Sequence, residues 1–139
     1  IEQKEKFDRV DDSVCAVRSA LQEGILPGGG LALWRLSPDL EQDCDHPEED
    51  IANRILHAAL RAPLLQIMEN AGLDGESIMD QPDLIDNTHG FDVKNEKYGD
   101  MYKMGVIDPL KVTKNALINA VSVATTILST DAIVTHARA

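Results

Sequence analysis

The chain has 139 residues, of which 43% are hydrophobic, and a formal net charge of −11 at pH 7. These values predict one folded domain with a modest core, and no apolar run approaches the roughly 20 residues of a membrane-spanning helix. Because an acidic domain repels phosphate backbones, we expect neither a nucleic acid nor a membrane as a partner.

The first predicted element is a helix over residues 8–23. Its apolar residues recur on one stripe with helical spacing, namely Val10, Val14, Val17 and Leu21. Gly24 and Pro27 are typical of a helix end. Cys15 lies within this pattern and is expected to be a buried small hydrophobe. With Cys44 it shows neither metal-type spacing nor the density of a disulfide scaffold, which fits a reducing compartment.

Three consecutive glycines, Gly28, Gly29 and Gly30, follow in "ILPGGGLALWRL" and open a second helix. The triplet lacks the Lys-Ser/Thr pair of a P-loop, and a helix rather than a strand is predicted before it, which excludes a dinucleotide fingerprint. Glycine permits positive φ and close backbone approach. A plain helix–helix turn and close approach to a ligand therefore both remain open.

Residues 37–49 are polar and punctuated by proline, as in a solvated loop. A long helix is predicted from about residue 47 to 71, because apolar residues recur at helical spacing and Gly72 then ends it. The stretch "HGFDVKNEKYGDM" predicts a small β-hairpin with Phe91, Val93 and Tyr98 on its strands and "KNE" at its turn.

The last long helix is predicted in "DPLKVTKNALINAVSVATTILST", with Asp108 as N-cap and Pro109 as its first residue. Apolar residues cover most of its circumference, so we expect it to be buried on several sides. The chain closes with "AIVTHA", an expected edge strand with few possible partners in this chain. The helix and the strand together resemble half of an interface.

Known catalytic signatures are sparse. The histidines His46, His57, His89 and His136 are scattered without zinc-ligand spacing, and no G-x-S-x-G elbow is present. No metal ligand is assigned. Asp11 and Asp12 lie early in the first helix, where carboxylates usually serve the macrodipole. A carboxylate there could also orient a water molecule for phosphoryl transfer.

Three segments together resemble the group I chaperonins, the 60 kDa GroEL type: "RVDDSVCAVRSALQEGILPGGGLAL", "GFDVKNEKYGDMYKMGVIDPLKVTKNAL" and "SVATTILSTDAIVT". The resemblance covers essentially the whole chain and corresponds to roughly the last quarter of a subunit. It implies a mainly α, multihelical half of the equatorial domain with a small β-hairpin and a short C-terminal strand. Residues 1–23 would be an intermediate-domain helix segment, and residues 24–139 the C-terminal part of the equatorial, nucleotide-binding domain.

The resemblance also assigns candidate site residues. Gly29 would lie against the sugar and base of ATP, with Gly28 and Gly30 shaping the turn. The base-facing hairpin residues would be Asp92, Val93 and Lys94, although many members have Asn-Ala-Ala there. Asp108 would bind the ribose hydroxyls. Asp12 would orient the attacking water, and Asp11 would remain a solvated helix residue.

The implied function is that of an ATP-dependent, stress-responsive protein-folding machine built as a double seven-membered ring. The complete protein would use ATP with magnesium and potassium, and its apical domain would bind unfolded clients and a lid co-chaperonin. The family's phosphate-binding Gly-Asp-Gly-Thr-Thr loop and its apical domain do not occur in these residues. We therefore expect the chain by itself not to bind nucleotide tightly or hydrolyse ATP, and to form a dimer or larger species.

The implied location is the bacterial cytoplasm, or alternatively the mitochondrial matrix or plastid stroma. Two other functions remain open on the residues alone. One is a freestanding helical scaffold or adaptor without ATP chemistry, and the other is a small nucleotide-binding module.

Overall fold

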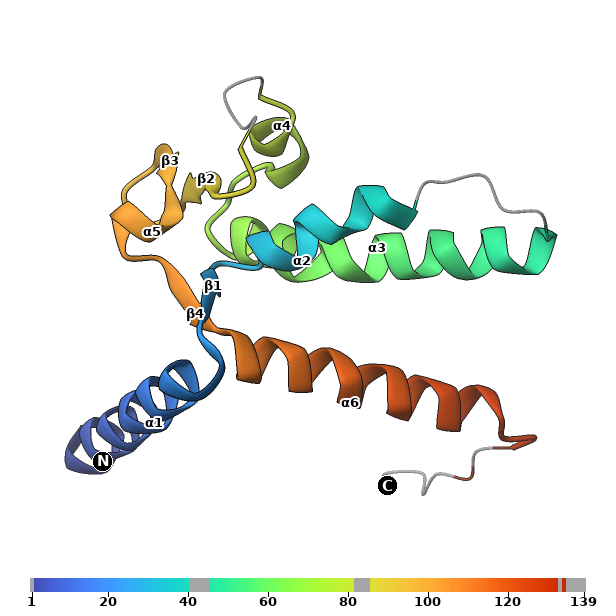
Figure 1. Cartoon of the computed structure of the whole chain (residues 1–139), viewed down its shortest axis with the longest axis horizontal. Helices are drawn as coiled ribbons and strands as arrows, with labels where there is room; N and C mark the ends of the chain where they lie inside the picture. The colour runs from blue at the N-terminus through green and yellow to red at the C-terminus, as the bar shows by residue number, and fades with distance from the viewer. Residues whose placement is uncertain (1, 41–45, 82–85, 133, 135–139) are drawn as a thin grey trace, which may run out of the picture. The chain divides into compact units, whose positions relative to one another are not determined.

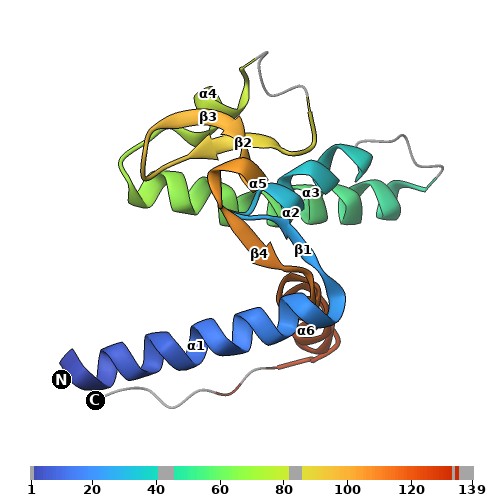
Figure 2. The ribbon, with the colours of Figure 1, turned by 60° about the vertical axis from the view of Figure 1, so that its left-hand side comes forward.

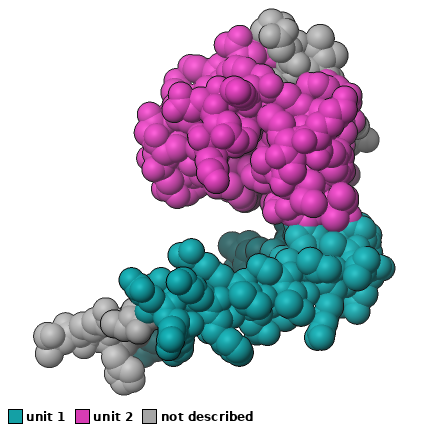
Figure 3. Space-filling model, turned by 90° about the vertical axis from the view of Figure 1, so that its left-hand side faces the viewer, with its two compact units in different colours: residues 1–24, 109–139 teal, residues 25–108 magenta. Residues whose placement is uncertain are grey.

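The computed structural model describes residues 2–40, 46–81, 86–132 and 134. The chain divides into two compact units, which Figure 3 colours separately: residues 1–24 with 109–139, and residues 25–108. The predicted mainly helical fold class is confirmed, with two small two-stranded sheets among the described residues. None of the described helices is both long enough and apolar enough to cross a membrane. Most of the expected terminal strand "AIVTHA" lies outside the described residues.

The first unit contains helices α1, Glu2–Glu23, and α6, Leu110–Leu128 (Figure 1). Helix α1 begins before the predicted residue 8, because the charged segment preceding it contains no glycine or proline that would stop a helix. Polar contacts join its C-terminal end to the start of α6. Lys111 Nζ donates to Gln22 Oε1 at 2.6 Å, and Lys114 forms an ion pair with Glu23.

The expected burial in this unit is wrong. Cys15 is exposed, and the apolar stripe of α1 is exposed as well, with Leu21 at 83%. No residue of α6 is buried, although this helix is apolar on most of its circumference. The physical reason is that two helices cover only one strip of each other, so the remaining apolar faces have no cover from the described part of this unit.

The start of α6 also differs from the prediction. Pro109 is the N-cap and Leu110 the first helical residue, without a side-chain cap hydrogen bond. Asp108 instead lies in strand β4, Ile107–Pro109, which pairs with strand β1, Ile25–Pro27 (Figure 2). Strand pairing holds Asp108 in extended backbone, so its side chain does not cap the helix.

In the second unit, β1 leads through the glycine triplet into α2, Leu31–Leu36, and a 3₁₀ helix, Ser37–Leu40. Helix α3, Pro47–Asn70, has bounds close to the prediction and continues through Pro63. Helix α2 lies along α3 in both ribbon views (Figures 1 and 2). The short helix α4, Gly75–Met79, follows.

The predicted hairpin is present, with β2, His89–Asp92, antiparallel to β3, Lys97–Asp100. Phe91 faces Tyr98 across the strands, and their ring centroids lie 4.9 Å apart. Val93 belongs to the turn rather than to a strand, which corrects its predicted place. The four-residue helix α5, Met101–Met104, connects the hairpin to β4.

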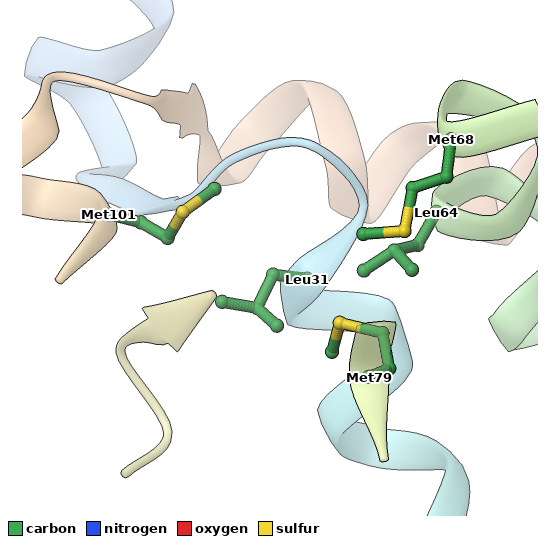
Figure 4. Close-up of a cluster of buried hydrophobic side chains, with 5 residues drawn as sticks. All are labelled: Leu31, Leu64, Met68, Met79 and Met101. Carbon is green, nitrogen blue, oxygen red and sulfur yellow. The ribbon is translucent and has the colours of Figure 1, made fainter. Parts of the chain in front are cut away.

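The core of the second unit is small and rich in methionine. Four helices contribute the five buried apolar side chains of its central cluster, which converge in Figure 4: Leu31, Leu64, Met68, Met79 and Met101. Phe91, Val93 and Val106 pack against this cluster. Methionine is flexible and fills irregular gaps, which suits a core bounded by short elements. The cluster holds the glycine turn and the hairpin against α3.

Candidate functional site

The glycine triplet forms a tight connection between a strand and a helix. The Gly28 N–H donates to the carbonyl of Val106 at 2.9 Å, which extends the pairing of β1 with β4. The backbone then adopts positive φ at Gly29, +67°, and Gly30, +80°. Side chains strongly disfavour this conformation, so two consecutive glycines allow the chain to reverse into α2.

The three glycines differ in their surroundings. A Cβ atom on Gly30 would lie 2.8 Å from the backbone nitrogen of Leu64, and one on Gly28 would lie 3.1 Å from the backbone of Ile107. At Gly29 the nearest atom would be Met101 Cε at 3.6 Å, an ordinary contact. Close packing within the protein therefore requires glycine at Gly28 and Gly30. Gly29 instead presents bare backbone to a hollow.

That hollow is a cavity of about 130 Å³ within the second unit. Its walls are mainly apolar and come from α3, the hairpin, α5 and the segment before β4. The lining residues are Gly29, Leu64, Ile67, Met68, Phe91, Asp92, Val93, Lys94, Met101 and Val106. The cavity therefore brings Gly29 together with the hairpin residues Asp92, Val93 and Lys94, which lie more than sixty positions away in the sequence.

Asp92 is used by the hairpin turn. Its Oδ1 accepts from the backbone N–H groups of Lys94, at 3.0 Å, and Asn95, at 3.4 Å, and its Oδ2 accepts from Asn95 Nδ2 at 2.5 Å. The side-chain bond from Asn95 is the main cause that lowers the pKa of Asp92, against the opposing effect of burial. Asp92 is only 8% exposed. Its carboxylate is therefore an ionised acceptor that holds the turn together.

Asp108 contacts the glycine triplet. Burial raises the pKa of its carboxyl group above the ordinary value, and the nearby backbone N–H of Gly29 opposes this increase. Asp108 is half-buried. The pairing of β4 with β1 places it beside the triplet, and this contact links the predicted sugar-binding residue to the cavity's lining.

Asp12 and Asp11 lie in the first unit, on α1, and both are exposed. The remaining candidates all belong to the second unit. Among the described residues, no three His, Cys, Asp or Glu side chains gather into a group that could hold a metal ion.

Sequence reasoning missed Arg35 on α2. Its Nη2 donates to the carbonyl oxygens of Asp86 and His89, each at 3.0 Å, so a guanidinium anchors the start of the hairpin to the helix that follows the triplet. The sequence offered one signal for this role, because Arg35 is the single charged residue in the largely apolar run "LALWRL". Its carbonyl partners are about fifty residues away and could not be inferred from periodicity.

A larger hollow of about 310 Å³ lies elsewhere in the second unit and contains none of the predicted residues. The Arg61 guanidinium lies 4.1 Å from the centroid of the Trp34 ring and forms an ion pair with Glu76 at 2.5 Å. The charged groups of Arg61 and Glu76 in this hollow are therefore paired with each other. The candidate functional site is therefore the smaller cavity, which Gly29 and the predicted hairpin residues line together.

Comparison with known proteins identifies relatives along the whole chain. The model of the TCP-1/cpn60 chaperonin family matches residues 2–138. The chain is 44% identical over 140 aligned residues to chaperonin GroEL 2 of Cereibacter sphaeroides, covering 98% of this chain and 26% of that protein. GroEL 2 of a named Cereibacter sphaeroides strain matches equally well. The chain thus spans about a quarter of the length of these relatives.

The fold agrees with a solved chaperonin. A crystal structure of a group III chaperonin in the open state superposes with a TM-score of 0.71 at 28% sequence identity, over 84% of this chain and 25% of that one. The resemblance to chaperonins noted from the sequence is therefore confirmed in both sequence and fold.

Proposed function

Because the chain belongs to the TCP-1/cpn60 chaperonin family, we propose that it forms part of an ATP-dependent protein-folding chaperonin and supplies the sugar and base side of its nucleotide site. The observation that carries this proposal is the convergence of Gly29, Asp92, Val93 and Lys94 on one cavity. The contact between Gly29 and Asp108 adds the ribose-binding carboxylate beside it.

The size and chemistry of the cavity support a base rather than a whole nucleotide. Pockets for drug-sized ligands measure roughly 300–1,000 Å³, and this one measures about 130 Å³. A single planar ring system fits between apolar walls such as Ile67, Phe91 and Val93. The phosphates would then extend outside the cavity, toward parts of the complete subunit that carry the phosphate-binding loop.

The two remaining roles concern Asp108 and Asp12. Asp108, when ionised, would accept hydrogen bonds from ribose hydroxyls while the Gly29 N–H fixes its position. Asp12 would orient the attacking water in the complete subunit, a role of the kind that phosphoryl transfer uses. Residues 1–23 would belong to the intermediate domain and residues 24–139 to the equatorial domain.

The same proposal covers assembly and location. We expect the complete subunits to assemble into two stacked rings of seven, with clients and a lid co-chaperonin bound by the apical domains. Magnesium and potassium would act with ATP. The likeness to Cereibacter sphaeroides chaperonins supports a bacterial cytoplasmic protein. A freestanding helical scaffold without ATP chemistry is the competing function.

Equilibrium binding of ADP to the complete subunit tests the proposal. Ile67 lines the cavity and its side chain is 41% exposed, so Ile67→Trp should fill the cavity from its edge without a backbone change. We expect ADP affinity to fall at least tenfold, which is about 1.4 kcal/mol. Ile55→Trp is the control, because Ile55 is exposed on the same helix and does not line the cavity.

Two outcomes would decide against the proposal. If the wild-type complete subunit bound no nucleotide, the scaffold function would replace it. If Ile67→Trp and Ile55→Trp bound ADP as tightly as the wild type, the base would lie somewhere other than this cavity.

A further inference from the structure

Helix α2 is connected to two parts of the cavity wall that come from distant places in the sequence. Gly29 lines the cavity and lies just before the helix, which begins at Leu31. Residues 91–94 of the hairpin form another part of the wall. The position of the hairpin relative to Gly29 therefore depends on how the hairpin is attached to α2.

Two side chains on one face of α2 make that attachment. Leu31 and Arg35 are four residues apart and so lie on the same face of the helix. A Cβ atom on Gly90 would lie 2.8 Å from Leu31 Cδ2, so strand β2 packs directly against this leucine. Arg35 Nη2 donates to the carbonyl oxygens of Asp86 and His89, each at 3.0 Å. An apolar contact and two hydrogen bonds thus hold the start of β2 on the helix.

The two contacts differ in what they can fix. Apolar burial is non-directional, whereas a hydrogen bond from a charged donor depends on distance and angle. Arg35 is half-buried, and burial is the larger cause that lowers the pKa of its guanidinium, against the opposing effect of Asp86. A partly desolvated cation needs acceptors from the protein. The guanidinium therefore sets where the hairpin starts relative to α2.

We propose that Arg35 is a positioning residue for the base-binding part of the nucleotide site, because it holds the hairpin where the cavity accommodates a purine ring. Arg35 does not itself line the cavity, so it acts through residues 91–94 and does not touch the ligand. This inference rests on the proposed nucleotide site and adds to it a residue that works from outside the cavity.

Steady-state ATP hydrolysis by the complete subunit separates positioning from folding. Arg35→Met keeps a long side chain and removes its donors. We expect KM for ATP to rise at least about tenfold and kcat to change less than about threefold, because other residues position the phosphates and the water. The equilibrium affinity for ADP should fall by a similar factor. An arginine that only stabilised the fold would instead lower kcat through the fraction of active subunits and leave KM unchanged.

A conservative variant tests whether the two hydrogen bonds are the cause. Both come from the same nitrogen of Arg35, Nη2, so one ammonium with three donors can replace it. Arg35→Lys should therefore keep KM within about threefold of the wild type. Should Arg35→Met fail to fold, Arg35→Gln retains a neutral donor on a shorter side chain and should raise KM at least about threefold.

Arg61→Met is the matched control. The Arg61 guanidinium also contacts α2, through the Trp34 ring, and it pairs with Glu76. It neither lines the cavity nor bonds to the hairpin carbonyls that Arg35 holds. Its loss should leave KM for ATP and the ADP affinity unchanged.

The possible results are distinct. If the wild type neither binds ADP nor hydrolyses ATP, the proposed function fails and this inference fails with it. If the wild type is active and the Arg35→Met or Arg35→Gln variant retains its KM, the inference is overturned while the nucleotide site stands. The same conclusion follows if Arg61→Met raises KM as much as Arg35→Met does, or if Arg35→Lys is no better than Arg35→Met.

Discussion

The backbone N–H of Gly29 lies near the carboxyl group of Asp108 and opposes the increase that burial causes in the pKa of this group. These residues are 79 positions apart, and the pairing of β1 with β4 brings them together. A glycine needed for positive φ and a half-buried acid thereby form one structural unit at the edge of the candidate cavity. The raised pKa of Asp108 follows from its burial there.

Because the Asp108 carboxyl group is half-buried, we predict that nucleoside binding weakens as the pH falls. If its ionised form accepts from ribose hydroxyls, binding is lost as pH falls through its folded-state pKa. Burial raises that pKa, so the loss should begin at a higher pH than for an ordinary aspartate, whose pKa is about 3.9. Adenosine is the suitable probe, because it has no titrating phosphate.

The prediction is checked by measuring the adenosine affinity of the complete subunit between about pH 4 and pH 7. The pH at which affinity begins to fall should be higher than the ordinary pKa of an aspartate would give. Asp108→Asn removes the titrating group and should give a weaker but flatter profile. A wild-type profile as flat as that of Asp108→Asn would show that Asp108 does not bind the sugar.

Gly29→Val should reduce nucleotide affinity in the complete subunit by at least tenfold, about 1.4 kcal/mol. The side chain would enter the cavity, and φ is +67° there. Gly105→Val is the matched control, because Gly105 has φ +75° and open space around it, so it reproduces the backbone strain alone. Equal affinities for both variants would reduce the role of Gly29 to the turn itself.

Asp12→Ala should preserve nucleotide binding in the complete subunit and nearly abolish ATP turnover. A residue that orients water acts mainly in the transition state, so the loss should appear in kcat. Asp11→Ala is the neighbouring control on the same exposed helix and should retain turnover. Weakened ATP binding with normal turnover in Asp12→Ala would contradict the assigned role.

The chain by itself should not hydrolyse ATP. Phosphoryl transfer depends mainly on positioning the phosphates and the magnesium ion, and the Gly-Asp-Gly-Thr-Thr loop is absent from these residues. Phosphate release from the purified 139-residue chain should equal that of its Asp12→Ala variant. Release clearly above that level would mean that these residues build a complete site.

The chain by itself should form a dimer or larger species at micromolar concentration. Helix α6 exposes apolar side chains along its length, among them Val121 at 46% and Ile127 at 51%, and uncovered apolar patches of several hundred Å² favour association. Light scattering should detect the species, and Val121→Glu with Val134→Lys should weaken it. Asn119→Glu adds a charge to the same helix about 200° away from Val121 and should have less effect. A clean monomer would favour the scaffold function.

Much of the local structure follows from the sequence because its causes are local. The bounds of α3, from Pro47 to Asn70, agree with a prediction made from apolar spacing. The hairpin is present where turn residues separate two short runs that carry the aromatic residues Phe91 and Tyr98. The chaperonin resemblance was also readable directly from the residues, and the family match over residues 2–138 confirms it.

The tertiary structure decided what depends on contacts between distant residues. The β1–β4 pairing places Asp108 in a strand beside Gly29 instead of at the N-cap of α6. The hairpin turn uses the Asp92 carboxylate for its own hydrogen bonds, and Asp92, Val93 and Lys94 line the cavity. Periodicity identifies which face of a helix is apolar, but it contains no information on whether another element covers that face. Cys15 and α6 are therefore exposed although their patterns predicted burial.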